Sequence, residues 1–140
     1  MRVYLDANVI LYVVEGTPKA QAASSEWIEA LTGQPDSALL TSALSHLECR
    51  IKHRRTGSEA GLSAIDAFLG QIEMAPVDLA CLDLAATIRA GARHRTPDAI
   101  HLATATIRGA DVFLTADRRL KAYRAIRVVD VLRDRPETTA

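Results

Sequence analysis

Short apolar runs alternate along this chain with longer stretches in which apolar residues recur every three or four positions. A run of a few apolar residues bounded by polar segments is typical of a buried strand. Five such runs occur, at residues 3–5, 38–41, 72–77, 112–114 and 126–131. Because helical stretches separate them, the pattern predicts an α/β fold with a mainly parallel sheet of about five short strands.

The stretches between the apolar runs have helical periodicity and recognisable ends. We expect helices at about residues 6–14, 19–31, 42–56, 58–70, 78–93 and 96–109, and a short one from residue 117. Thr96-Pro97-Asp98 is the strongest start signal, because it combines a capping Thr, a Pro and an acid in the first turn. We expect one domain over residues 1–132 and a polar C-terminal tail over residues 133–140.

The composition narrows the class of protein. The chain has 140 residues, of which 49% are hydrophobic and 24% are charged, and these are ordinary values for a globular domain. No run of 18 apolar residues predicts a membrane span, and Asp6 and Asn8 interrupt the apolar N-terminus, so we expect no signal peptide. Cys49 and Cys81 form no CxxC pair and are typical of buried thiols in a reducing compartment. We therefore expect a cytoplasmic protein.

Four acidic residues are expected to converge at one edge of the sheet. Asp6 directly follows the first strand and Asp117 follows the fourth, whereas Glu48 and Asp98 lie near the starts of helices. In doubly wound sheets these positions share the edge at which ligands bind. Two carboxylates about 4 Å apart repel each other by about 4 kcal/mol at an effective dielectric of 20, so such a cluster needs protons or cations. An all-oxygen ligand set favours Mg²⁺ or Mn²⁺.

Each of these acids also has a purely structural alternative. The three aspartates could cap helices or complement the helix dipole, and Glu48 could be a solvated acid that balances neighbouring basic residues. Thr115 could position a water or a phosphate, but it could equally cap the turn of Asp117. Asn8 could likewise position a water or a phosphate, or it could simply belong to the start of the first helix. His101, three residues after Asp98 on one helix face, could orient that carboxylate or simply pack in the core.

Four segments of the sequence resemble, in order, the motifs of PIN-domain nucleases. These segments are Leu5-Asp6-Ala7-Asn8, Thr41-Ser42-Ala43-Leu44-Ser45-His46-Leu47-Glu48, Thr96-Pro97-Asp98-Ala99-Ile100-His101-Leu102-Ala103-Thr104-Ala105 and Leu114-Thr115-Ala116-Asp117-Arg118-Arg119-Leu120. The length and motif order are similar to those of VapC toxins from bacterial toxin–antitoxin pairs. The resemblance covers the chain from Arg2 to about Val131, and the ordered set of four is more specific than any single motif.

This resemblance implies a PIN-like three-layer sandwich and a Mg²⁺- or Mn²⁺-dependent endoribonuclease. It also implies a homodimer that a small VapB-like antitoxin holds inactive. Metal-activated water would attack an RNA phosphodiester, and a metal pair could stabilise the leaving oxygen. We expect Asp6 and Asp98 to be direct metal ligands, with Glu48 and Asp117 completing the set, so that all four acids are catalytic.

Basic residues are candidates for contacts to the RNA backbone. The net charge is zero, with 17 basic and 17 acidic residues, but residues 1–49 carry −4 and residues 50–140 carry +4. The candidates fall in three runs: Arg50, Lys52 and Arg54; Arg93 and Arg95; and Arg118 and Arg119. A solvated helix face explains any single run equally well. Aromatic residues are only 4% of the chain, so base stacking should contribute little.

Three rival hypotheses remain open at this stage. A phosphoacceptor receiver domain also places acids and Mg²⁺ at a sheet edge, but it needs a Lys after the last strand, where this chain has Arg133. A second alternative is a non-catalytic metal-binding α/β module. The third is a housekeeping RNA-processing PIN nuclease that has no antitoxin.

Overall fold

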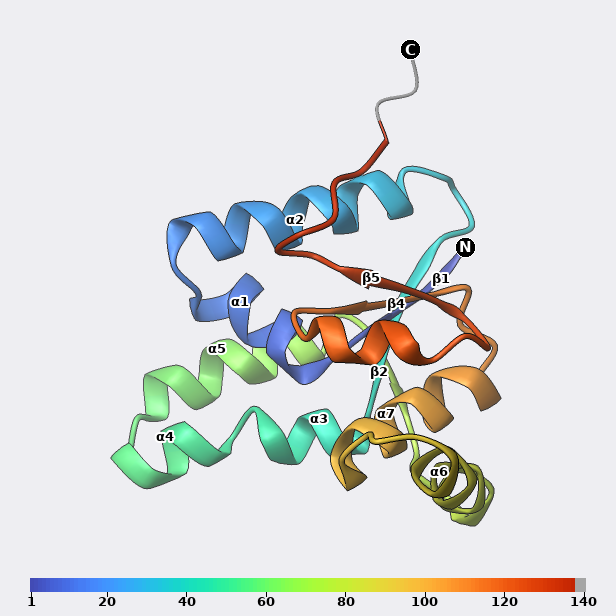
Figure 1. The fold of residues 1–140 in the computed structure, drawn as a ribbon. Coiled ribbons are helices and arrows are strands. Elements are labelled where there is room, and N and C mark those ends of the chain that lie inside the picture. Colours follow the sequence, from blue (N-terminus) through green and yellow to red (C-terminus); the bar gives the residue numbers. More distant parts are fainter. Residues whose placement is uncertain (138–140) are drawn as a thin grey trace.

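Five parallel strands form a single sheet in the order β3-β2-β1-β4-β5 (Figure 1). The coordinates are a computed structural model that describes residues 1–137. The strands are β1 (Arg2–Leu5), β2 (Ala38–Ser42), β3 (Glu73–Ala75), β4 (Val112–Thr115) and β5 (Arg127–Asp130). β1 is central, since Tyr4 pairs with Leu40 of β2 on one side and with Phe113 of β4 on the other. The predicted parallel α/β fold is confirmed.

The alternation of side chains along the strands divides the core into two halves. Val3 and Leu5 of β1 point to one face of the sheet and Tyr4 points to the other. In β4, Leu114 joins the first half and Phe113 the second. All of these side chains are fully buried, as expected for a sheet that is covered on both faces.

Helices cover both faces of the sheet, so the fold has three layers (Figure 1). The helices are α1 (Ala7–Glu15), α2 (Pro18–Thr32), α3 (Ala43–Glu48), α4 (Ile51–Thr56), α5 (Glu59–Leu69), α6 (Leu79–Gly91), α7 (Thr96–Ile107) and the 3₁₀ helix η1 (Arg118–Ala122). α1, α2 and α5 supply apolar side chains to the half of the core that contains Leu5. α6, α7 and η1 supply them to the half that contains Tyr4.

One helix expected from the sequence is two helices in the structure. The expectation of a continuous helix over residues 42–56 is wrong, because the chain leaves the helix at Cys49 and Arg50. The Arg50 N–H bonds the Leu47 carbonyl, three residues back, at 3.1 Å, which tightens the turn. α3 then packs on β2 and α7 while α4 packs on α5, so the two pieces need different axes. No Gly or Pro signals the break.

The segment after β5 is tied to the body of the domain. Asp134 binds the Lys121 ammonium at 2.7 Å, and its carbonyl accepts a hydrogen bond from the Trp27 indole at 3.0 Å. The expected tail therefore begins as an anchored turn, and its residues 138–140 lie outside the described residues. Within the described part of the chain, no helix has the length and apolar character needed to cross a membrane.

Candidate active site

The acids gather at the carboxyl ends of β1 and β4. After β1 the chain builds the sheet outward through β2 and β3, and it then returns to place β4 on the other side of β1. This reversal of direction is the topological switch point, where parallel α/β sheets leave a crevice for ligands. Asp6 follows β1 and Thr115 ends β4, so both lie at that crevice.

Asp6 is the most buried of the four acids, with 5% of its surface exposed. Its Oδ1 accepts a hydrogen bond from the Ala7 N–H at 2.8 Å and thereby caps α1, while Oδ2 accepts one from the Thr115 hydroxyl at 2.7 Å. Burial raises the pKa of Asp6. His101 and the Thr115 hydroxyl oppose this increase, and the charges of Asp98 and Glu48 add to it. Asp6 is therefore a helix cap and a member of the acidic cluster at the same time.

Thr115 and Asn8 connect the ends of β1 and β4. The Thr115 hydroxyl accepts the Asp117 N–H at 3.0 Å while it donates to Asp6, and the Asn8 amide lies 3.5 Å from it. The Asn8 Oδ1 in turn accepts the Ala116 N–H at 3.1 Å. The two polar residues suggested as positioning groups thus belong to one network that fixes Asp6 relative to Asp117.

Glu48 of α3 is held by His101, which comes from α7. The imidazole Nε2 lies 2.5 Å from Glu48 Oε1 and 3.7 Å from Asp6 Oδ1. Burial lowers the pKa of His101, but the hydrogen bond to Glu48 and the charge of Asp6 outweigh it, so the net pKa is raised. The expected partner, Asp98, is not the one observed. His101 is as buried as a core residue, at 1% exposure, but it is hydrogen-bonded within the site.

Asp98 and Asp117 each contact an arginine close to them in sequence. The Arg95 Nε lies 3.4 Å from Asp98 Oδ2, and Arg119 makes a two-pronged contact with both oxygens of Asp117, the shortest at 2.6 Å. Hydrogen bonds from Arg119 lower the pKa of Asp117, against the effect of partial burial. Both arginine side chains remain about two-thirds exposed, at 69% and 65%. The sequence predicts contacts with RNA for both arginines and gives no sign of these contacts with the acids.

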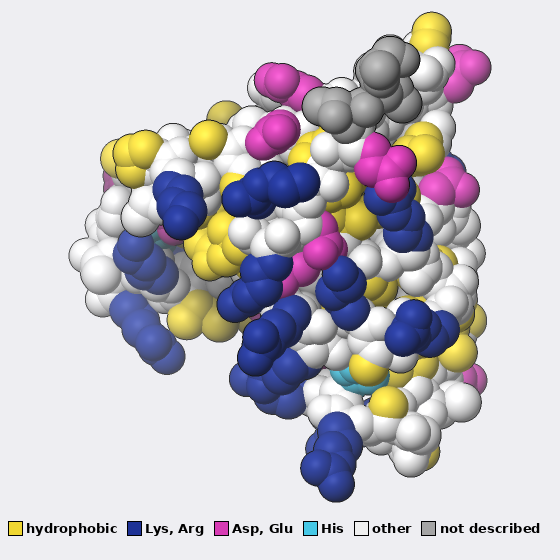
Figure 2. Space-filling model, turned by 45° about the horizontal axis from the view of Figure 1, so that its top comes forward, with side chains coloured by type: hydrophobic (Ala, Val, Ile, Leu, Met, Phe, Trp, Pro, Cys, Tyr) yellow, Lys and Arg dark blue, Asp and Glu magenta, His cyan; other side chains and the backbone are white. Residues whose placement is uncertain are grey.

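The other basic candidates differ in how freely they can reach a ligand. Lys52, Arg54, Arg93 and Arg118 are exposed. Arg50 is not, since its side chain is 15% exposed and forms an ion pair with Asp66 of α5. Figure 2 shows Lys and Arg side chains gathered in a band across one face of the molecule, with acidic side chains among them. Of the exposed arginines, Arg95 lies next to Asp98, and Arg119 lies next to Asp117.

The donor set suits a hard divalent cation, since all four acids offer oxygen ligands. Among residues 1–137, however, no three His, Cys, Asp or Glu side chains already stand in metal-binding geometry. His101, Arg95 and Arg119 each bind one carboxylate. A metal would compete with the two arginines for Asp98 and Asp117, whereas His101 contacts only Oε1 of Glu48.

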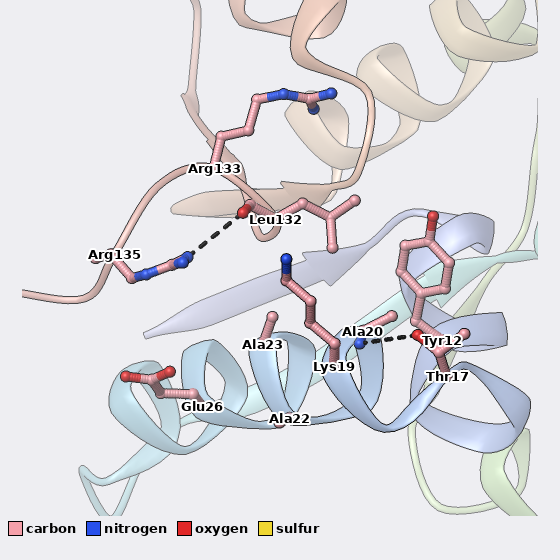
Figure 3. Close-up of a pocket in the computed structure, with 10 residues that line it drawn as sticks. All are labelled: Tyr12, Thr17, Lys19, Ala20, Ala22, Ala23, Glu26, Leu132, Arg133 and Arg135. Carbon is pink, nitrogen blue, oxygen red and sulfur yellow. Dashed lines mark hydrogen bonds between the residues drawn. The ribbon is translucent and has the colours of Figure 1, made fainter.

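A hollow of about 650 Å³ lies away from the acids, between α2 and the segment after β5 (Figure 3). Lys19 rises from α2 toward Leu132, and the Arg133 side chain points away from α2 (Figure 3). Tyr12, Thr17 and several alanines complete its lining, which includes none of the four acids. This hollow is distinct from the candidate active site.

Comparison with known proteins agrees with this architecture. Residues 3–126 match the PIN domain family. The fold is similar to that of VapBC2 from Rickettsia felis bound to a fragment of its promoter DNA, with 17% identity, a TM-score of 0.74 and coverage of 92% of this chain and 98% of that one. It is also similar to DNA-bound VapBC from Salmonella typhimurium, with 20% identity, a TM-score of 0.74 and coverage of 94% and 98%.

A third similar structure is the Mycobacterium tuberculosis toxin VapC20, described as cleaving the sarcin–ricin loop. It has 16% identity, a TM-score of 0.67 and coverage of 89% of this chain and 98% of that one. No curated protein matches the sequence. The family match spans most of the chain and includes all four motifs, so the chain belongs to the PIN domain family.

Proposed function

We propose that this PIN domain is a divalent-metal-dependent endoribonuclease and the toxin of a toxin–antitoxin pair. The observation that carries the proposal is that Glu48 and Asp98 lie near the buried Asp6 at the switch point of the sheet, while Thr115 links Asp6 to Asp117. Asp6, Asp98 and Asp117 all lie at helix starts, but helix capping does not account for the charges of Asp98 and Glu48 beside the buried Asp6, which a cation would stabilise.

Asp6 and Asp98 would hold Mg²⁺ or Mn²⁺ directly, and Glu48 and Asp117 would complete the set. Such a metal lowers the pKa of a bound water and neutralises charge that develops on the phosphate. The Ala7 N–H and the Thr115 hydroxyl fix the carboxylate of Asp6, so its oxygens need little rearrangement. Thr115 and Asn8 also hold the turn before Asp117 in place.

The exposed basic residues would bind the RNA backbone. A shallow hollow of about 540 Å³ next to Asp117 is lined by Arg118, Arg119, Lys121 and Arg133, together with two acids. Arg95 borders Asp98, and Arg93, Lys52 and Arg54 extend the basic surface. Arginine suits this role because its planar guanidinium contacts phosphate through two parallel hydrogen bonds. Affinity for RNA should accordingly fall as salt rises.

Cleavage assays with purified protein test the enzymatic part. The protein should cut structured RNA, including a sarcin–ricin loop oligonucleotide, in Mn²⁺ or Mg²⁺ and should stop in EDTA. Asp98→Asn should abolish cutting. Asp83→Asn, which changes an exposed acid on α6, is the matched control and should leave cutting intact. Cutting that survives EDTA or Asp98→Asn would overturn the metal mechanism and favour a non-catalytic module with a contaminating nuclease.

The toxin part rests on neighbouring structures that include VapBC2, VapBC and a toxin–antitoxin complex from Klebsiella pneumoniae. Expression of the chain alone should arrest growth, and a small VapB-like protein encoded beside it should relieve the arrest. Asp98→Asn should be harmless. Light scattering of the purified chain should give the mass of a homodimer. An active ribonuclease that does not arrest growth would instead be a housekeeping RNA-processing enzyme.

A further inference from the structure

A buried chain of polar side chains runs from β2 through β1 and α7 to Glu48. The Ser42 hydroxyl lies 2.9 Å from the Tyr4 hydroxyl, which lies 2.7 Å from His101 Nδ1. The other imidazole nitrogen, Nε2, lies 2.5 Å from Glu48 Oε1. Ser42, Tyr4 and His101 are all fully buried, whereas the Glu48 side chain is partly exposed and forms the end of the chain at the crevice.

The core fixes the position of this chain. The Tyr4 ring stacks on Phe113 of β4 with centroids 5.1 Å apart, and it meets the His101 ring edge-on at 5.8 Å. The Ser42 oxygen also accepts the Leu44 N–H at the start of α3, the helix that carries Glu48. His101 therefore has little freedom to turn, and its Nε2 is held facing the Glu48 carboxylate.

The direction of the last hydrogen bond is settled by chemistry. A carboxylate only accepts, so Nε2 carries the hydrogen that it shares with Glu48. The two hydroxyls can reverse their own hydrogen bonds, and they can satisfy Nδ1 whether it donates or accepts. A buried polar chain that is satisfied throughout is rigid, and its members are costly to displace.

We propose that His101, anchored by Tyr4, is the positioning residue that holds the Glu48 carboxylate beside Asp6 within the proposed metal site. The proposal rests on the proposed metal site. His101 takes one oxygen, Oε1, and leaves Oε2 of Glu48 for a cation. Its Nε2 also lies 3.7 Å from Asp6 Oδ1, so one ring sets the spacing of two acids that come from different elements.

The protein contains a second buried His–Glu pair that serves as a matched control for this test. His53 of α4 is also buried and also bonds a glutamate, since its Nε2 lies 2.7 Å from Glu15 Oε2. That pair lies outside the acidic cluster. Replacement of His53 should therefore reproduce the general cost of losing a buried His–Glu hydrogen bond without touching the metal site.

The experiment measures Mn²⁺ affinity by calorimetry for the full chain and four variants. Partners that orient metal ligands typically contribute 10- to 100-fold to affinity, so His101→Ala should weaken Mn²⁺ binding by about that factor. Tyr4→Phe should weaken it by about threefold to tenfold. His101→Gln, which keeps an N–H near Glu48, should recover most of the loss. His53→Ala should lower the melting temperature and leave Mn²⁺ affinity unchanged.

A second, metal-free measurement separates this proposal from the proposed function. In EDTA, proton NMR should show a downfield imidazole N–H resonance for His101 that is protected from exchange and moves in Glu48→Gln. If wild type binds no Mn²⁺ but shows this resonance, the metal site fails and the positioning contact stands. If the resonance is absent, or His101→Ala binds Mn²⁺ as tightly as wild type or more tightly, the positioning role is overturned.

Discussion

Arg119 is expected to act in opposite directions on the two ligands of the site. Its guanidinium occupies both oxygens of Asp117 through contacts of 2.9, 3.2 and 2.6 Å, and the same residue lies in the basic hollow proposed for RNA. Arg119→Ala should therefore free Asp117 for metal and, at the same time, remove a phosphate contact. Mn²⁺ affinity should rise while RNA affinity falls.

The exposure of the pair sets the size of the effect. Because 65% of the Arg119 side chain is exposed, solvent screens the ion pair, and exposed pairs contribute little to stability. We expect Mn²⁺ affinity to rise by a factor of about two to five. Loss of one phosphate contact should reduce the slope of log affinity against log salt by about 0.7 to 0.9. The Mn²⁺ and RNA affinities of Arg119→Lys should lie between those of wild type and Arg119→Ala, since Lys keeps the charge and loses the two-pronged contact.

Calorimetry with Mn²⁺ and fluorescence anisotropy with an uncleavable RNA in EDTA measure the two effects separately. Arg118→Ala is the matched control: this neighbour is exposed and forms no ion pair within residues 1–137. It should change the salt slope for RNA and leave Mn²⁺ affinity alone. If Arg119→Ala leaves Mn²⁺ affinity unchanged or weakens it, Arg119 does not compete with metal and the reasoning is refuted.

Three further predictions concern stability. In EDTA, the pKa values of Asp6 and His101 are raised on folding, so the folded chain binds more protons than the unfolded chain. The free energy of unfolding should therefore fall as the pH rises above about 4 for Asp6 and above about 6.5 for His101, by at most about 1.4 kcal/mol per pH unit for each group. Urea melts should show that Asp6→Asn removes the acidic part of this decline, and a flat wild-type profile would contradict it. Mn²⁺ at about 100 times its dissociation constant should raise the free energy of unfolding by about 2.7 kcal/mol, as measured by calorimetric melting. A melting temperature that Mn²⁺ does not change would count against a metal site in the folded protein. Gly61→Ala should lower the free energy of unfolding in urea melts by about 1–3 kcal/mol, because a Cβ there overlaps the His53 ring. Gly91 has open space around it, so Gly91→Ala should be neutral or stabilising. Equal stabilities for the two variants would refute the clash.

The sequence alone predicts the order of helices and strands, and it predicts that Asp6 and Asp117 lie at the carboxyl edge of the sheet. Strand runs such as residues 3–5 and 112–114 are short and wholly apolar, which is typical of a sheet covered on both faces. Placement of Asp6 and Asp117 at the strand ends then follows from the parallel topology alone. Local patterns carry this information, because strand ends and helix starts depend on neighbouring residues.

The contacts between the acids and their partners were not available from the sequence. His101 and Glu48 are 53 residues apart, and they meet only because α3 and α7 pack against each other at the end of the sheet. The break at Cys49 and Arg50 has the same origin, since it lets α3 and α4 pack on different elements. Tyr4 gives a weak sequence signal of the polar network, because a tyrosine hydroxyl within a buried apolar run requires a hydrogen-bond partner.

The sequence pairs Asp6 with Asp98 as the expected direct ligands, but the structure groups the four acids differently, by whether buried or exposed side chains hold them. Asp6 and Glu48 are held by hydrogen bonds from buried groups, among them Thr115 and His101, which are costly to break. Asp98 and Asp117 instead contact exposed arginine side chains, which exchange readily with solvent and ions, although Asp117 Oδ1 also accepts the Arg119 backbone N–H at 3.0 Å. In the proposed site, the oxygens of Asp6 and Glu48 would be in place before RNA arrives, because their hydrogen bonds do not depend on the substrate. A phosphate that draws Arg95 and Arg119 away would free Asp98 and Asp117 for the metal, so binding of RNA and completion of the metal site would favour each other.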